Sequence, residues 1–475
     1  MSTTPNANSG DGRLPPELVQ MLRSLFREHA DEVIEAIGAS GFDPTQMLDP
    51  RLLDADPAAR AFLTGQLRRV LARPNSDDPV NWEVAHDLAR QAAHAGGDPS
   101  VTAAEARAVS EALAVAELWL DPVTEFPRAG GRVSALSVAE WIEATLPAWR
   151  RMVTPVAASV ANALASAIGR HGAPLGEDVS GGIKGMLRAI GGAVFGMQIG
   201  HAVGTLSREV MGLSDIGIPL ADPTATALAP TGIARFASGL DSPAEEVRLF
   251  VAAREAATAR LFTHAPWLGG HLLGAVEAYA RGIVIDVDAV EEAVRGIDPG
   301  DPEAMREAIS GGLFEMTRSP EQNAALERLE TALALVEGWV DRVTADATRE
   351  HLPDAAALGE MIRRRRAAGG PAERAFATLV GLELRPRRAR EASRLWGIVA
   401  DEAGQAEREG LWGHPDLLPT AGDLTDPSGF LARRAARAEA DAAVDAAIAE
   451  LLDNPDAGGG GSGGDRVGDG GDGGK

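Results

Sequence analysis

The sequence predicts a mainly α-helical protein, and three observations carry that prediction. Alanine and leucine dominate the 475-residue chain, and both residues favour helices. Hydrophobic residues make up 45% of the chain but aromatic residues only 4%, which is typical of helices that pack through small side chains. Apolar residues also recur at helical spacing along most of the sequence. We therefore expect a large helical body with at most a small sheet.

Helical periodicity delimits the expected elements from the N-terminus onward. The expected helices cover residues 16–38, 57–72, 80–95, 101–119, 134–170 and 179–212. Segments that contain proline, at 74–79 and 122–132, separate some of these helices. Between residues 214 and 239 the helical period is lost and proline, threonine and glycine become frequent. That segment is expected to hold a short strand or an extended loop.

Two helix starts follow the extended segment. Residues 242–245 (Ser-Pro-Ala-Glu) and 319–322 (Ser-Pro-Glu-Gln) both have the order of a capping box with proline in the first helical turn. The first is expected to open a helix that contains Glu255. The second is expected to open a long helix that contains Glu337.

Four glycines recur at intervals of four residues, at Gly192, Gly196, Gly200 and Gly204. On a helix they form a stripe without side chains, against which another helix can approach closely. The surrounding segment, residues 189–206, carries no formal charge but is only weakly apolar. We expect a packed helix of a soluble body here, and no membrane span.

Composition and periodicity divide the chain into five expected parts. Residues 1–12 and 456–475 are of low complexity and are expected to be disordered. Between them we expect a helical N-terminal region at 13–178, a helical core at 179–425 and a C-terminal helix at 426–455.

Charge and cysteine content exclude several classes of protein. The formal net charge of −24 argues against binding to nucleic acid or to anionic membranes. The chain has no cysteine, which excludes disulfides and thiolate metal sites. The first residues lack the pattern of a signal peptide, so we expect a cytoplasmic location. The arginines between residues 363 and 390 are expected to pair with acidic neighbours, with contact to RNA or phosphate as the alternative.

One pair of segments suggests a specific chemistry. Residues 249–268 read LFVAAREAATARLFTHAPWL, and residues 333–343 read LALVEGWVDRV. In order and spacing they resemble the zinc-site half of a helical zincin, where the first segment carries His-Glu-x-x-His and the second a glutamate ligand. Further similar segments lie at 80–91, 191–220, 381–396 and 412–424. From about residue 80 to 429 the chain resembles an actinobacterial family of zinc-dependent metalloproteases or hydrolases.

The resemblance implies a zincin-like core at 179–425, zinc as the family's cofactor and hydrolysis as its activity. Carried over by position, it assigns Glu255 to the general base and Glu337 to a zinc ligand. Arg254 and Thr258 stand at the two histidine positions, so the motif is degenerate. Arginine does not deprotonate in proteins and cannot bind zinc, and a threonine hydroxyl is a poor zinc ligand. We therefore expect no zinc at the ordinary site of this chain.

Other side chains near the motif suggest further hypotheses. Arg254 could bridge Glu255 and Glu337 and so replace the charge of the metal, or it could be an ordinary solvated arginine. His264 could be a substitute ligand, although packing or helix capping is the more common role of such a histidine. Trp339 is expected to anchor the core and is the tryptophan with a candidate role in the cleft.

Two functions remain open from the sequence. The favoured interpretation is a pseudoenzyme, a catalytically silent zincin-like protein that binds or scaffolds a protein or peptide partner. The alternative is an active metallohydrolase or peptidase with a non-standard metal site, in which Glu255 acts as the general base. The residues identify neither the substrate nor the partner.

Overall fold

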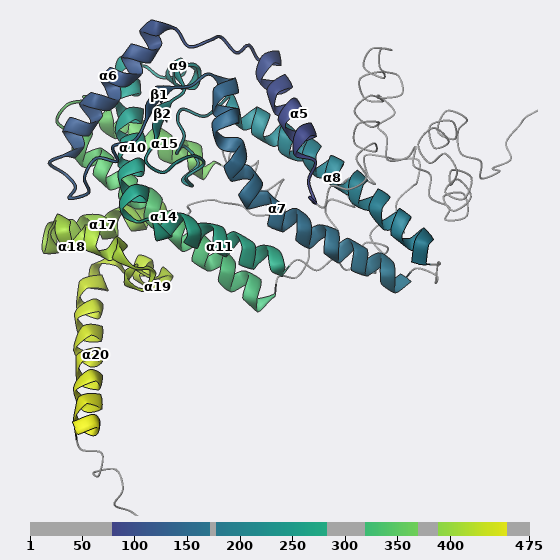
Figure 1. Cartoon of the computed structure of the whole chain (residues 1–475). Helices are drawn as coiled ribbons and strands as arrows, with labels where there is room; N and C mark the ends of the chain where they lie inside the picture. Colours follow the sequence, from purple (N-terminus) through teal and green to yellow (C-terminus); the bar gives the residue numbers. More distant parts are fainter. Residues whose placement is uncertain (1–77, 172–176, 283–318, 369–387, 454–475) are drawn as a thin grey trace, which may run out of the picture.

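A computed structural model describes residues 78–171, 177–282, 319–368 and 388–453 (Figure 1). Helices dominate this part of the chain, and a single small sheet accompanies them there. The prediction of a mainly helical fold is confirmed. The predicted helices at 16–38 and 57–72 and the predicted disordered ends lie outside the described residues.

The helices begin and end close to the predicted positions. The first four described helices are α5 (Trp82–Ala95), α6 (Ala103–Leu120), α7 (Val138–His171) and α8 (Glu177–Ser207). The middle of the chain forms α9 (Pro230–Ala237), α10 (Ala244–His264), α11 (Trp267–Arg281), α14 (Pro320–Thr348) and α15 (Ala355–Ala367). The last part forms α17 (Ala389–Ala403), α18 (Gln405–Gly410), α19 (Ala421–Thr425) and α20 (Phe430–Asp453), with three short 3-10 turns between them, η3 (Leu411–Gly413), η4 (Pro415–Leu417) and η5 (Pro427–Gly429).

The small sheet joins two distant segments. Strand β1 (Val133–Ala135) pairs in parallel with β2 (Thr226–Leu228), and Gly212 forms an isolated antiparallel bridge with Leu228. Strand β2 confirms the short strand or extended segment that the sequence predicts before α10. The sequence missed β1, because a three-residue strand is too short to show a period, and α7 accordingly begins at Val138 rather than at residue 134. It also missed α9, an eight-residue helix inside the segment where helical period was lost.

The two predicted capping boxes differ in outcome. At the start of α14, the Ser319 hydroxyl accepts a hydrogen bond from the Gln322 N–H (3.2 Å), and the Gln322 side chain accepts one from the Ser319 N–H (3.0 Å). This box is confirmed. Helix α10 instead begins after Pro243, without a side-chain cap. The predicted box at 242–245 is wrong, because proline takes the cap position and leaves Ser242 one residue too early.

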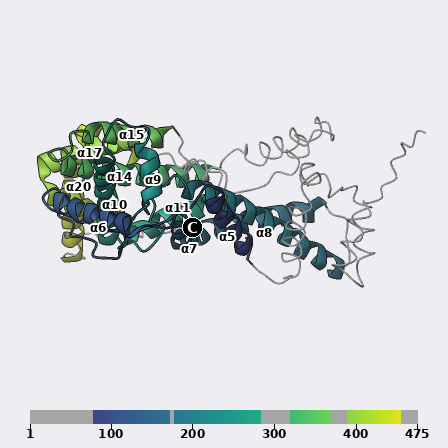
Figure 2. The ribbon, with the colours of Figure 1, turned by 90° about the horizontal axis from the view of Figure 1, so that it is seen from above.

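Helices α10 and α14 lie at the centre of the fold. Both are buried on nearly all sides, and they pack against each other while α6, α11, α15 and α17 surround them (Figure 2). Helices α6 and α7, from the predicted N-terminal region, therefore contact α10 and α11 of the predicted core directly. Helices α5, α7 and α8 extend to one side of this body (Figures 1 and 2).

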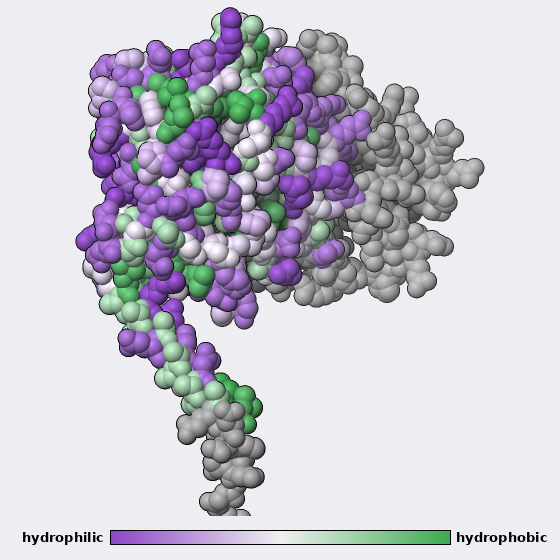
Figure 3. All heavy atoms as spheres, turned by 60° about the vertical axis from the view of Figure 1, so that its left-hand side comes forward, coloured by the Kyte–Doolittle hydropathy of each residue, from purple (hydrophilic) through white to green (hydrophobic). Residues whose placement is uncertain are grey.

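The exterior is mostly hydrophilic on the face shown in Figure 3, from which α20 projects. Among the described residues, no helix has both the length and the apolarity that a membrane crossing requires.

The glycine stripe of α8 is a packing face for α5. A Cβ atom added to Gly200 would lie 2.6 Å from the Ala85 carbonyl oxygen and 2.7 Å from the Leu88 Cβ. Elsewhere on α8, Val194 and Met197 are 37% and 44% accessible, whereas Ile199 and Val203 are buried. The glycines allow backbone-to-backbone contact between α8 and α5.

This contact predicts the effect of adding one methyl group. Gly200→Ala should lower the free energy of unfolding by about 1–3 kcal/mol, because the backbone of α5 cannot yield without repacking. Gly191→Ala, on the same helix, meets no atom within 4 Å and should raise stability by up to about 1 kcal/mol. Denaturant unfolding of both variants measures the difference. Equal effects of the two substitutions would contradict the close approach of α5 and α8.

Candidate functional site

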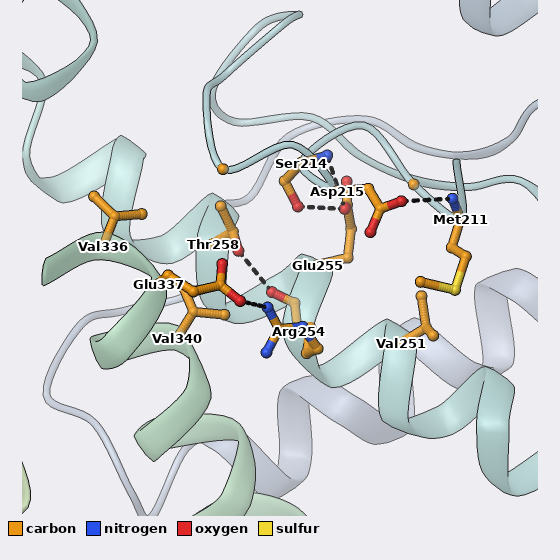
Figure 4. Close-up of a pocket in the computed structure, with 12 residues that line it drawn as sticks. Met211, Ser214, Asp215, Val251, Arg254, Glu255, Thr258, Val336, Glu337 and Val340 are labelled. Atoms are coloured by element: carbon orange, nitrogen blue, oxygen red, sulfur yellow. Dashed lines mark hydrogen bonds and ion pairs between the residues drawn. The ribbon is translucent and has the colours of Figure 1, made fainter. Parts of the chain in front are cut away.

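The two segments that resemble a zincin motif lie on the central helix pair. Helix α10 carries Arg254 and Thr258 one turn apart, and α14 presents Glu337 toward them (Figure 4). A small pocket opens between these helices and the segment that follows α8, with about 20 Å³ of free volume, enough for one water molecule. Twelve residues line it: Met211, Gly212, Ser214, Asp215, Gly217, Val251, Arg254, Glu255, Thr258, Val336, Glu337 and Val340.

A buried ion pair occupies the centre of this arrangement. The Arg254 Nη2 donates to Glu337 Oε1 at 2.5 Å, and the two side chains are 12% and 6% exposed. The Arg254 Nη1 lies 3.6 Å from an oxygen of Asp341, one turn further along α14. Burial opposes the charged form of Glu337, but the guanidiniums of Arg254 and Arg366 outweigh it and hold the pKa of this carboxyl below its usual range. The sequence hypothesis that Arg254 meets Glu337 thus agrees with the geometry.

Further arginines reach the same acidic side chains from α15. The Arg366 Nη1 lies 3.4 Å from Glu337 Oε2, and the Arg363 Nη1 donates to Asp341 Oδ2 at 2.8 Å. Burial raises the pKa of Asp341, and the nearby Arg254 and Arg363 oppose that rise. The predicted pairing with an acidic neighbour is present at Glu360, which Arg363, Arg364 and Arg390 contact, while residues 369–387 of the run lie outside the described part of the chain. The sequence did not indicate that the run also reaches Glu337 and Asp341. The i,i+3 spacing of Arg363 and Arg366 was the sequence feature that could have shown that both side chains lie on one face of a helix.

Glu255 faces away from Arg254. Its Oε1 accepts hydrogen bonds from the N–H groups of Leu213 (3.2 Å) and Ala227 (3.4 Å). Its Oε2 accepts from the N–H (3.1 Å) and the hydroxyl (2.5 Å) of Ser214. Burial raises the pKa of Glu255 to about 7, although these donors act to lower it. Adjacent helical residues point about 100° apart, which explains why Arg254 does not bridge both glutamates as the hypothesis expected.

The remaining predicted site residues make local or distant contacts. The Thr258 hydroxyl donates to the Arg254 carbonyl oxygen at 2.8 Å. His264, the last residue of α10, has its Nε2 3.0 Å from the Pro127 carbonyl oxygen and stacks on the Phe126 ring. Ten residues separate it from Arg254, about 15 Å along the helix. The structure therefore does not bring His264 to the pocket.

Trp339 lies in the core rather than in the pocket. It is fully buried, and its indole N–H donates to Glu409 Oε2 at 3.2 Å. The Arg408 guanidinium lies 5.9 Å from its ring centre. These contacts give Trp339 the geometry of a core anchor, as the sequence suggested, and they place it outside the lining of the pocket.

The residues present do not fit the zinc ion that the motif resemblance implies. Zinc requires lone-pair donors such as imidazole or free carboxylate. The Arg254 guanidinium stands at the position that the resemblance assigns to the first histidine. The Thr258 hydroxyl is engaged within its helix, and Glu337 is held by two arginines. Over the described ranges, no group of three or more histidine, aspartate or glutamate side chains is placed to hold a metal ion.

Comparisons with known proteins identify a family and a similar structure for this chain. A family model described as "Zincin-like metallopeptidase" matches residues 80–431. A crystal structure from Chloroflexus aurantiacus, of a "putative hydrolase with a novel fold", matches with a TM-score of 0.52 and 19% identity. The match covers 75% of this chain and 98% of that one, and at this identity the likeness concerns the fold. No curated protein matches the chain.

The raised pKa of Glu255 predicts a pH dependence. Its folded-state pKa is about 7 against an ordinary value of 4.5, so the folded protein holds this proton more tightly than the unfolded chain does. Stability from this group is therefore full below about pH 4.5 and declines as pH rises to about 7. Glu255→Gln should remove that decline, whereas Glu245→Gln, on the exposed side of α10, should keep it. Unfolding free energies measured from pH 4.5 to 8 decide this, and parallel curves for wild type and Glu255→Gln would contradict the assignment.

Proposed function

The chain belongs to the zincin-like metallopeptidase family, and we propose that it is a catalytically silent member that binds or scaffolds a protein or peptide partner. The observation that supports this proposal is the buried ion pair between Arg254 and Glu337, two positions that the sequence resemblance assigns to metal ligands. A guanidinium there supplies positive charge without the open coordination position that a catalytic metal offers.

The chemistry of peptide hydrolysis supports the same proposal. A zincin activates a metal-bound water, and the motif glutamate takes its proton. In this chain the Glu255 carboxylate accepts four hydrogen bonds from protein donors, so its oxygens are already engaged. The pocket beside it has room for about one water molecule. A peptide therefore has no space to place its scissile bond between Glu255 and Glu337 in this conformation.

The alternative function, an active metallohydrolase with a non-standard site, needs a substitute for the lost histidines. His264 was the candidate, and it contacts Pro127 and Phe126 instead of the pocket. No contact among the described residues favours this alternative over a silent member. It remains the outcome that the following experiment is designed to detect.

Two measurements on tag-free protein, purified without chelator or added metal, test the proposed function. Plasma mass spectrometry should find no stoichiometric zinc, even after incubation with excess zinc, because Arg254 holds the ligand position. A mixed peptide library should show no hydrolysis that distinguishes wild type from Glu255→Gln. One zinc per chain that is lost in Glu337→Ala, together with hydrolysis that is lost in Glu255→Gln, would establish the active alternative.

A further inference from the structure

Two acidic side chains of α14 are buried side by side. Glu337 and Asp341 lie one helical turn apart and are 6% and 8% exposed. Burying a charged carboxylate is costly unless a cation compensates it. Arg254 provides one positive charge near both of them. One guanidinium against two carboxylates leaves the acidic pair only half compensated.

Helix α15 supplies the remaining charge through one of its faces. Arg363 binds Asp341, and Arg366 lies against Glu337 while it donates to the Asp215 carbonyl oxygen at 2.6 Å. Glu337 therefore has a different guanidinium at each oxygen. Arg364, on the other face of α15, is 70% exposed and binds Glu360 at the surface. The basic run thus divides into an inward and an outward set.

We infer that Arg366 is a second cation in place of the metal, and that it excludes zinc from Glu337 independently of the lost histidines. A metal ion that approached Oε1 of Glu337 would meet Arg254, and one that approached Oε2 would meet Arg366. Arginines on two helices, Arg254 on α10 and Arg366 on α15, therefore both keep zinc from Glu337. This inference rests on the proposed function, and it makes Arg366 a positioning residue for the carboxylate of Glu337.

A practical consequence follows for any attempt to restore the site. Replacing Arg254 and Thr258 by histidine would recreate the motif on α10 and free Oε1 of Glu337. Arg366 would still lie 3.4 Å from Oε2. A positive charge so close to the bound ion opposes zinc binding by electrostatic repulsion, so the two histidines alone should give only weak zinc binding.

Three variants test this. The first is Arg254→His with Thr258→His. The second adds Arg366→Gln, and the third adds Arg364→Gln as a control that removes an arginine from the outer face of the same helix. Zinc affinity is measured by competition with a chromophoric chelator at pH 7.5, zinc stoichiometry by plasma mass spectrometry, and folding by circular dichroism. The variant with Arg366→Gln should bind one zinc at least about 10-fold more tightly than the other two, because it lacks the repulsion between the guanidinium and the ion.

The outcomes separate this inference from the proposed function. Equal zinc affinity in all three variants, or no zinc in folded protein carrying Arg366→Gln, would overturn the role of Arg366. Stoichiometric zinc in the unsubstituted protein would instead overturn the proposed function. If Arg366→Gln prevents folding, Arg366→Met takes its place, because it keeps the aliphatic stem that packs in the interior.

Discussion

The contact between Arg254 and Glu337 is the interaction on which the centre of this protein depends. It joins α10 to α14, the two helices that the rest of the fold surrounds. Both side chains are largely shielded from solvent, at 12% and 6% exposed, so loss of either one leaves the other with only its weaker partner, Asp341 or Arg366. A buried ion pair is not by itself a large source of stability, because desolvation offsets the attraction. Its importance lies in the penalty for an unpaired charge, which fixes the two helices in one arrangement.

The two glutamates that the resemblance assigns to catalysis and to metal binding have structural partners in this chain. Glu255 attaches α10 to the backbone of the loop after α8 and to strand β2. Glu337 attaches α14 to α15 through Arg366. Both carboxylates therefore hold elements of the fold together.

Much of the fold could be predicted from the sequence, because the information is local. Helical spacing located α5, α6 and α8 within a few residues, and the order of residues 319–322 located the start of α14. The glycine interval likewise identified the packing face of α8. Prediction failed where structure depends on distant contacts: strand β1 exists only because it pairs with residues more than 90 positions away.

The candidate site shows the same division. The motif located Arg254, Glu255 and Glu337, and charge alone suggested that the arginine meets a carboxylate. The orientation of the Glu255 side chain depends on how the loop after α8 packs against α10. The contact of Arg366 with Glu337 depends on how α15 packs against α14. The spacing of the motif residues predicts neither contact. Helical periodicity could have predicted that Arg363 and Arg366 share one face of a helix, but it could not have predicted that this face packs against Glu337.

A double-mutant cycle between Arg254 and Glu337 is the most direct test of this account. Unfolding free energies are measured for Arg254→Ala, for Glu337→Gln, for the double variant and for wild type. Each single substitution should cost about 1–3 kcal/mol, because it removes the closest partner while Arg366 still faces Glu337 and Asp341 still faces Arg254. The double variant should be more stable than the sum of the two losses predicts, by about 1–2 kcal/mol. Losses that add to within about 0.5 kcal/mol would show that the two side chains do not depend on each other, and would contradict the replacement of the metal by a guanidinium.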